Sequence, residues 1–209
     1  MIKAVIFDID GVLIDSFEAN LKLFRSVLKQ AGYKTGISIR KYKELFFRTA
    51  SDTFKAVTDG APEEIDRLMA ILHKYPLSKF DFPIMPNSVK IIKRLAKKYK
   101  LGLVTARMKV GVDHYLDSTK TKDDFEVVVH FGHYTNPKPH PEPLLVACKR
   151  LKVKPSEAIY IGDALSDIQS AKAAGMKVIL FPNRRIQGAD DYAKEFAEIP
   201  KIVEQLAKN

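Results

Sequence analysis

The stretch Lys3–Leu13, with the sequence KAVIFDIDGVL, decides the fold of this chain. Its apolar run, Ala4–Phe7, is typical of a strand that is buried on both faces inside a parallel sheet. Asp8 and Asp10 follow one residue apart, and Gly11 allows the backbone to turn sharply away after them. Aspartate is rarely buried without a partner, so two carboxylates at the end of a buried strand indicate a nearby cation or a proton. The alternative is an ordinary strand-to-loop junction with solvated aspartates.

The composition is that of a globular protein with one sizeable core. The chain has 209 residues, of which 46% are hydrophobic, and no apolar run approaches the roughly 20 residues that span a bilayer. The N-terminus enters a strand almost at once and leaves no room for a signal peptide. A single cysteine, Cys148, excludes an internal disulfide, and its place in a helical apolar pattern indicates core packing. These features predict a cytoplasmic protein.

The formal net charge of +10 is spread along the chain. Residues 16–85 hold twelve Lys and Arg against eight Asp and Glu, and the remaining residues hold twenty-three against seventeen. A nucleic-acid-binding face would concentrate this excess in an arm or a stripe. We therefore expect no nucleic-acid partner.

Residues 16–83 carry helical patterns and no strand pattern. Asp15 is placed to cap a first helix, whose apolar face runs from Phe17 to Leu28. Three more helices are predicted, over residues 39–47, 52–57 and 62–75, before the proline-punctuated linker FPIMP at 82–86. We therefore predict an all-helical domain over residues 16–83, inserted after the first strand of a core formed by residues 1–15 and 84–209.

Beyond the linker, helices and strands alternate. Strands are predicted over residues 101–105, 126–129, 158–162 and 177–181, and helices over residues 88–99, 110–116, 141–151, 165–174 and 199–208. Together with Ala4–Phe7, this gives five short apolar strands separated by helices. Such an order predicts the α/β class, with a doubly wound parallel sheet.

Side chains with ligand chemistry follow four of these strands. In a parallel α/β sheet, ligands bind outside the carboxyl ends of the strands. At that edge the sequence places, in chain order, Asp8, Asp10, Thr105, Lys138, Asp163 and Asp167. The carboxylates suit a hard cation such as Mg²⁺, while the lysine, the hydroxyl and nearby backbone N–H groups suit a phosphate.

These residues resemble the four motifs of the haloacid dehalogenase superfamily. The motifs are Asp8–Val12 (DIDGV), Thr105, Lys138 and Gly162–Asp167 (GDALSD), and their order and spacing cover the chain from residue 3 to about 181. The segment Lys138–Pro143, KPHPEP, closely resembles that of phosphoglycolate phosphatase-like members, and a helical insert after the first motif is similar to their cap. The resemblance implies a Rossmann-like core with a helical cap and a Mg²⁺-dependent phosphatase.

Carried over residue by residue, the resemblance implies a role for each acidic position. Asp8 would attack phosphorus, form an aspartyl-phosphate and bind Mg²⁺. Asp10 would act as general acid and then as base, while its backbone carbonyl binds Mg²⁺. Asp163 would be the third metal ligand, and Asp167 would orient the metal or water.

Five positions are expected to contact the substrate. Thr105 and Lys138 would hold the phosphoryl oxygens, and Ala106, where relatives often have asparagine, would offer its backbone N–H. Arg107 is a candidate substrate contact at the ligand edge, and Arg48 in the helical insert is a candidate for a second anion of the substrate. For both arginines the alternative is a solvated surface charge.

Two positions bear on the reaction type. An acidic residue at Asp10 favours phosphoryl chemistry over carbon–halogen cleavage, and Asn20 stands where β-phosphoglucomutase-like mutases tend to have a histidine. We expect a phosphatase of a small phosphorylated metabolite, either phosphoglycolate-like or a sugar phosphate, that acts as a monomer or homodimer without a membrane partner. The alternatives are a sugar-phosphate mutase and a non-catalytic phosphate-binding protein.

Overall fold

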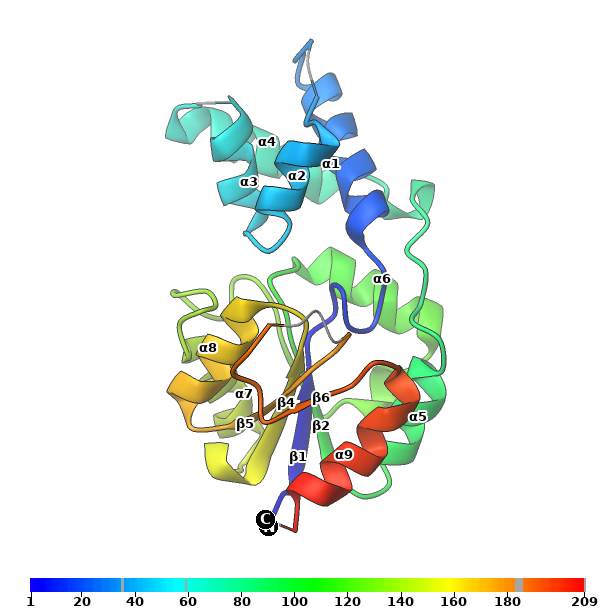
Figure 1. Ribbon diagram of the computed structural model, residues 1–209. Coiled ribbons are helices and arrows are strands. Elements are labelled where there is room, and N and C mark those ends of the chain that lie inside the picture. Colours follow the sequence, from blue (N-terminus) through cyan, green and yellow to red (C-terminus); the bar gives the residue numbers. More distant parts are fainter. Residues whose placement is uncertain (35, 59, 183–185, 209) are drawn as a thin grey trace. The chain divides into compact units, whose positions relative to one another are not determined.

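The computed structural model describes residues 1–34, 36–58, 60–182 and 186–208. They form two compact units, which are considered separately: Met1–Asp15 with Ile84–Asn209, and Ser16–Pro83 (Figure 1). Within these described ranges, no helix has both the length and the apolar character needed to cross a membrane.

In the part of the larger unit that the structure describes, the chain forms a six-stranded sheet in which every pairing is parallel. Its strands are β1 (Ala4–Phe7), β2 (Lys100–Val104), β3 (Val127–Val129), β4 (Ala158–Gly162), β5 (Lys177–Leu180) and β6 (Asp191–Tyr192). The strand order is β3-β2-β1-β4-β5-β6, so the chain winds outward from β1 in both directions. This is the doubly wound arrangement that the sequence predicted, and its ligand edge lies where β1 ends.

Helices connect the strands and cover both faces of this sheet (Figure 1). They are α5 (Ser88–Leu95), α6 (Lys109–Thr119), α7 (Glu142–Leu151), α8 (Leu165–Ala174) and α9 (Ile199–Leu206). Side chains alternate along β1, so Ala4 and Ile6 join the core beneath α7 and α8. Phe7 faces the other way and stacks on Phe196 at a centroid distance of 6.2 Å. All four residues of β1 are fully buried, which confirms the prediction for this strand.

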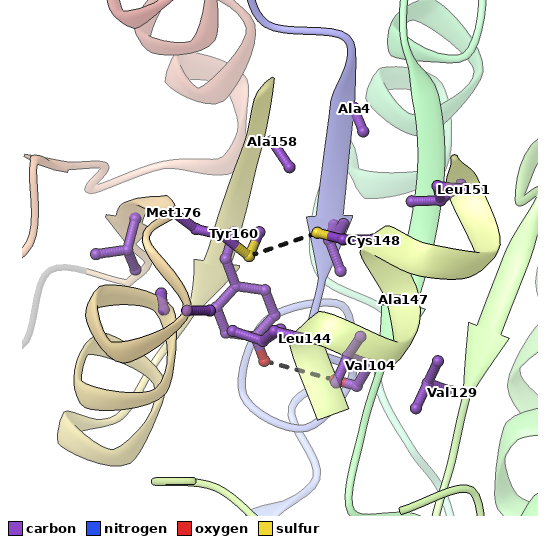
Figure 2. Packing of buried hydrophobic residues seen from close by; sticks show 14 of the residues in the cluster. Ala4, Val104, Val129, Leu144, Ala147, Cys148, Leu151, Ala158, Tyr160 and Met176 are labelled. Carbon is purple, nitrogen blue, oxygen red and sulfur yellow. Dashed lines mark hydrogen bonds between the residues drawn. The ribbon is translucent and has the colours of Figure 1, made fainter. Parts of the chain in front are cut away.

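Figure 2 shows the core between the sheet and helices α7 and α8. Cys148 on α7 is buried there, with its sulfur 4.0 Å from that of Met176, so the cysteine has the packing role expected for it. Tyr160, from the middle of β4, extends its hydroxyl through the same core toward the backbone carbonyl of Val104, 3.5 Å away.

The smaller unit contains helices α1 (Phe17–Gln30), α2 (Ile39–Leu45), α3 (Ala50–Thr58) and α4 (Pro62–Lys74). Aromatic rings hold the first three together: Phe24 contacts Tyr42 at 5.7 Å and Phe54 at 5.1 Å between centroids. Its described residues contain no strand, in agreement with the pattern read from the sequence.

Two local predictions were wrong. The sheet has a sixth strand, β6, which is only two half-buried residues long and pairs with β5 at the sheet edge. The N-cap of α1 is Ser16 rather than Asp15, and its side chain makes no capping hydrogen bond. Both features depend on backbone pairing and geometry that leave little trace in residue type.

Candidate active site

A buried ion pair joins the end of β1 to the loop before α7. Asp8 directly follows β1, where its backbone N–H donates to the carbonyl of Ile161 in β4 at 2.9 Å. Lys138 lies in the loop between β3 and α7, and its Nζ donates to Oδ2 of Asp8 at 2.6 Å. The Lys138 side chain is only 11% exposed and that of Asp8 only 10%, so solvent and salt screen this attraction weakly.

Asp167 supports the same lysine from the first turn of α8. Its Oδ1 accepts a second bond from Lys138 Nζ at 2.6 Å, and its Oδ2 accepts from the backbone N–H groups of Asp163 and Ala164 at 3.0 and 3.1 Å. A first-turn carboxylate satisfies the otherwise unpaired N–H groups at a helix start. Gly162 permits this approach, since a Cβ built there would lie 2.4 Å from Cβ of Asp167. The protein itself therefore engages both oxygens of Asp167.

Tyr160 completes this network, and sequence reasoning missed it. Its hydroxyl accepts from Lys138 Nζ at 3.0 Å and donates to Asp167 Oδ1 at 3.2 Å. Burial, followed by the charges of Asp167 and Asp8, raises the pKa of Tyr160 well above its ordinary value, so the phenol stays neutral. A tyrosine in the middle of a buried strand needs a polar partner for its hydroxyl, and this was the available signal.

Burial and neighbouring charges shift the pKa values of the central pair. Burial raises the pKa of Asp8 to about 6; the Lys138 ammonium opposes this rise, and the Asp167 and Asp10 carboxylates add to it. Burial alone would lower the pKa of Lys138, but Asp167 and Asp8 outweigh it and hold that pKa well above its ordinary value. Lys138 is therefore a permanent cation at the end of β1.

Three buried carboxyl groups form a cluster at this edge. Asp8, Asp163 and Asp167 each offer an oxygen within 4.8 Å of the others. The turn after β1 makes room for Asp163: Gly11 has a φ of +74°, and a Cβ built on it would lie 2.0 Å from Oδ2 of Asp163. An L-residue with a side chain would therefore be strained there and would collide with the carboxylate.

A second ion pair lies beside the cluster, between Asp10 and Arg107. Arg107 donates from Nε to Asp10 Oδ2 and from Nη2 to Asp10 Oδ1, both at 2.8 Å. Its backbone N–H donates to the Thr105 hydroxyl at 3.2 Å. Thr105 is itself buried at the end of β2, with its N–H bonded to the carbonyl of Val129 at 3.0 Å. In the loop after β2, Arg107 thus links the Thr105 hydroxyl to the Asp10 carboxylate.

Glu142, at the start of α7, anchors the loop that carries Lys138. Its carboxylate accepts from the backbone N–H groups of Thr135 and Asn136 at 2.8 and 2.9 Å, and from the Asn136 side chain at 2.8 Å. Those bonds lower the pKa of Glu142. Sequence reasoning did not assign this residue a role, although a glutamate in a helix's first turn is a common partner for backbone N–H groups.

The structure brings most of the predicted site residues to one edge of the sheet. The residues linked there by these contacts are Asp8, Asp10, Thr105, Arg107, Lys138, Asp163 and Asp167, and Ala106 lies half-buried between Thr105 and Arg107. Arg48 belongs to the helical unit, where it is exposed in the turn after α2 and its N–H donates to the carbonyl of Leu45 at 2.9 Å.

Known proteins resemble this chain along most of its length. The pyrophosphatase PpaX of Bacillus cereus is 30% identical over 181 residues, which cover 84% of this chain and 81% of the relative. A phosphoglycolate phosphatase of Salmonella typhi is also 30% identical, over 83% of this chain and 79% of its own. The crystal structure of a β-phosphoglucomutase from Clostridium difficile shares the fold, with a TM-score of 0.83, 22% identity and coverage of 100% and 98% of the two chains.

A family model decides the classification. The model of the haloacid dehalogenase-like hydrolases matches residues 5–181, which begin in β1 and end just beyond β5. That range includes both aspartates after β1, the hydroxyl after β2, the buried lysine and the GDALSD segment at α8. The chain belongs to the haloacid dehalogenase-like hydrolases.

Proposed function

We propose that this hydrolase is a Mg²⁺-dependent phosphatase of a small phosphorylated metabolite, acting through an aspartyl-phosphate on Asp8. The observation that carries the proposal is the contact between Asp8 and Lys138, a carboxylate and a permanent ammonium 2.6 Å apart at the carboxyl end of the central strand. A nucleophile and a phosphate-binding cation must lie side by side in such a reaction. The buried carboxyl cluster around them supports the proposal of a metal site, since three carboxyl oxygens lie close together there.

The donor set of the cluster fits Mg²⁺. All its ligand atoms are oxygens, which hard cations prefer, and Lys138 donates to two of the three carboxyl groups, those of Asp8 and Asp167. Asp8, Asp163 and the backbone carbonyl of Asp10 would hold the ion, with Asp167 orienting Lys138 beside them. When bound, the ion neutralises negative charge and polarises phosphoryl oxygens.

Charge balance explains why these groups occur together. A phosphate dianion near ionised Asp8 meets a repulsion of roughly 4 kcal/mol per charge pair at 4 Å in an effective dielectric near 20. Lys138 offsets part of that repulsion, and Thr105 offers a hydroxyl to the phosphoryl oxygens. The backbone N–H of Ala106 would take the place of an asparagine amide common in relatives.

Two steps then complete the hydrolysis. An oxygen of Asp8 bonds to phosphorus as the bond to the leaving alcohol breaks, and Asp10 gives the alcohol its proton. Asp10 next takes a proton from water, whose oxygen attacks phosphorus and releases Asp8 and inorganic phosphate. A phosphate-binding protein without catalysis would not need this second carboxylate.

We propose phosphoglycolate as the leading substrate, with sugar phosphates next. The names of the relatives support a small phosphate compound, and the KPHPEP segment that carries Lys138 supports the phosphoglycolate phosphatase type. The helical unit, joined to the core through only two crossings of the chain, is proposed to act as a cap that selects the substrate.

A sugar-phosphate mutase is the second candidate, because a β-phosphoglucomutase shares the fold. Asn20, where such mutases tend to have a histidine, favours hydrolysis. Product analysis with glucose 1-phosphate and a bisphosphate activator separates the two: a hydrolase releases inorganic phosphate, whereas a mutase forms glucose 6-phosphate.

The direct test is a panel of phosphate compounds assayed with Mg²⁺ and ranked by kcat/KM. It should contain phosphoglycolate, sugar phosphates, pyrophosphate, glycerol 2-phosphate and an aryl phosphate. The proposal expects Mg²⁺-dependent release of phosphate from at least one ester, and loss of that activity in chelator. Release of no phosphate from any compound, or undiminished release in chelator, would refute it.

A further inference from the structure

The ion pair between Asp10 and Arg107 restrains the orientation of the Asp10 carboxylate as well as balancing its charge. Two parallel N–H···O bonds of 2.8 Å join the planar guanidinium to both carboxylate oxygens of Asp10. Such a bidentate pair restrains the carboxylate plane, which a single bond or a lysine cannot do. The Arg107 side chain is only 10% exposed and that of Asp10 26%, so the pair is largely shielded from water.

The backbone of Arg107 is held at the same time. Its N–H donates to Thr105 Oγ1 at 3.2 Å, and its carbonyl accepts from the N–H of Phe131 at 2.9 Å. Gly111, in the first turn of α6, leaves the space that the side chain occupies: a Cβ built there would lie 3.2 Å from Nη1 and 3.5 Å from Cδ of Arg107. The backbone from which the guanidinium extends to Asp10 is therefore held in place.

We propose that Arg107 is a positioning residue that orients the Asp10 carboxylate for proton transfer, rather than a residue that contacts the substrate. The inference rests on the proposed function, in which Asp10 protonates the leaving alcohol and later deprotonates water. A proton-transferring group must be held within hydrogen-bond reach of both, and a displacement of about 1 Å can cost on the order of 100-fold in rate. The two bonds to Arg107 supply that constraint, and because each carboxylate oxygen has two lone-pair sites, one site can accept from Arg107 while the other exchanges the proton.

A double-mutant cycle with three substrates tests the proposal. Glycerol 2-phosphate has a poor leaving group and no second anion, phosphoglycolate has a second anion, and an aryl phosphate has a good leaving group. For glycerol 2-phosphate, Arg107→Ala should lower kcat by about 10- to 100-fold with KM nearly unchanged, because only proton transfer is impaired. The aryl phosphate, whose departure needs little acid help, should lose less of its phosphorylation rate in a single turnover.

The double variant separates positioning from substrate binding. If Arg107 acts through Asp10, adding Arg107→Ala to Asp10→Asn should cost no more than about threefold further. Arg107→Lys should be nearly as slow as Arg107→Ala, since lysine keeps the charge but loses the fork. Lys109→Ala removes a cation in an exposed pair at the start of α6 and is the matched control, with wild-type kinetics expected.

Three results would overturn the proposal: losses that multiply in the double variant, full rescue by Arg107→Lys, or an effect confined to KM for phosphoglycolate. If the Arg107 variants do not fold, NMR of the wild type and Asp10→Ala carries the test. The Arg107 Nε–H should exchange slowly with solvent in the wild type and lose that protection in Asp10→Ala; equal protection in both contradicts the pair. If the wild-type protein hydrolyses no substrate, the proposed phosphatase activity is refuted. The NMR comparison then still tests the Asp10–Arg107 pair by itself.

Discussion

The ammonium of Lys138 lies 2.6 Å from Oδ2 of Asp8, although 130 residues separate them in the chain. This contact ties the carboxyl end of β1 to the loop before α7. It brings a permanent cation to a buried carboxyl group that clusters with two further carboxyl groups. Lys138 therefore offsets part of the buried negative charge at the position proposed for the chemistry.

Replacing Lys138 with methionine should destabilise the protein strongly. The change leaves Asp8 and Asp167 buried beside each other without their shared cation, and breaking a buried pair in this way costs roughly 3–5 kcal/mol. Urea unfolding in chelator measures the loss. Lys109→Met, in an exposed ion pair, is the control and should change stability by less than about 1 kcal/mol. Equal stability of the two variants would contradict the account of Lys138.

Asp8→Asn should stabilise the metal-free protein at neutral and alkaline pH. Burial raises the pKa of Asp8 from 3.8 to about 6, so between these values the unfolded chain loses the proton first and stability falls as pH rises. Asparagine has no such proton to lose. We expect a gain over the wild type on the order of 2–3 kcal/mol at pH 8, shrinking toward pH 5. Urea unfolding in chelator between pH 5 and 8 measures it, and a gain independent of pH would contradict the assignment.

Mg²⁺ should raise the melting temperature of the wild type and act far less on Asp163→Asn. An ion that binds only the folded state stabilises by about 2.7 kcal/mol at 100 times its Kd, and Asp163 is one of the three clustered carboxyl groups. Ca²⁺ should bind but inhibit turnover, since it prefers more ligands and looser geometry. Thermal melts with each ion provide a readout independent of activity. A wild type whose melting temperature ignores Mg²⁺ would count against the metal site.

Arg48→Ala should change substrate preference more than overall rate. If Arg48 meets a second anion, kcat/KM for phosphoglycolate should fall by about tenfold, the value of roughly 1.4 kcal/mol of lost interaction, while an aryl phosphate is spared. Arg40→Ala, an exposed arginine of α2, is the matched control. Equal losses on both substrates would remove Arg48 from the proposed substrate contacts.

Sequence patterns predicted the fold of the larger unit because its strands are short, apolar and separated by clear helix signals. The strands Ala4–Phe7 and Ala158–Gly162 and the helix Leu165–Ala174 have the predicted bounds. The helix ends with Gly175 at a φ of +77°, the left-handed conformation that glycine favours. By contrast, β6 is defined by its pairing with β5, and two residues offer no periodicity to detect.

The sequence predicted which side chains of the candidate site gather at one edge of the sheet, but it did not predict how they pair. The order of aspartates, hydroxyl and lysine along the strands placed them at one edge. That Arg107 would pair with Asp10, 97 residues away, depends on where the loop after β2 meets the turn after β1. Tyr160 was hidden for another reason, because its place in an apolar strand resembles ordinary core until its hydroxyl is seen beside Lys138.

The central claim is that Asp8 forms a covalent phosphoenzyme, and trapping that species tests it most directly. In Asp10→Asn, an aryl phosphate should still phosphorylate Asp8, because a good leaving group needs little acid help. Release should be slow without a base for water, since general-base help is worth roughly 10²–10⁴-fold. Acid-quenched Asp10→Asn should therefore carry one phosphoryl group within residues 2–15 by intact-mass and peptide mass spectrometry, and Asp8→Asn should carry none. A phosphoryl group elsewhere, or turnover by Asp8→Asn after deamidation has been excluded, would contradict the account.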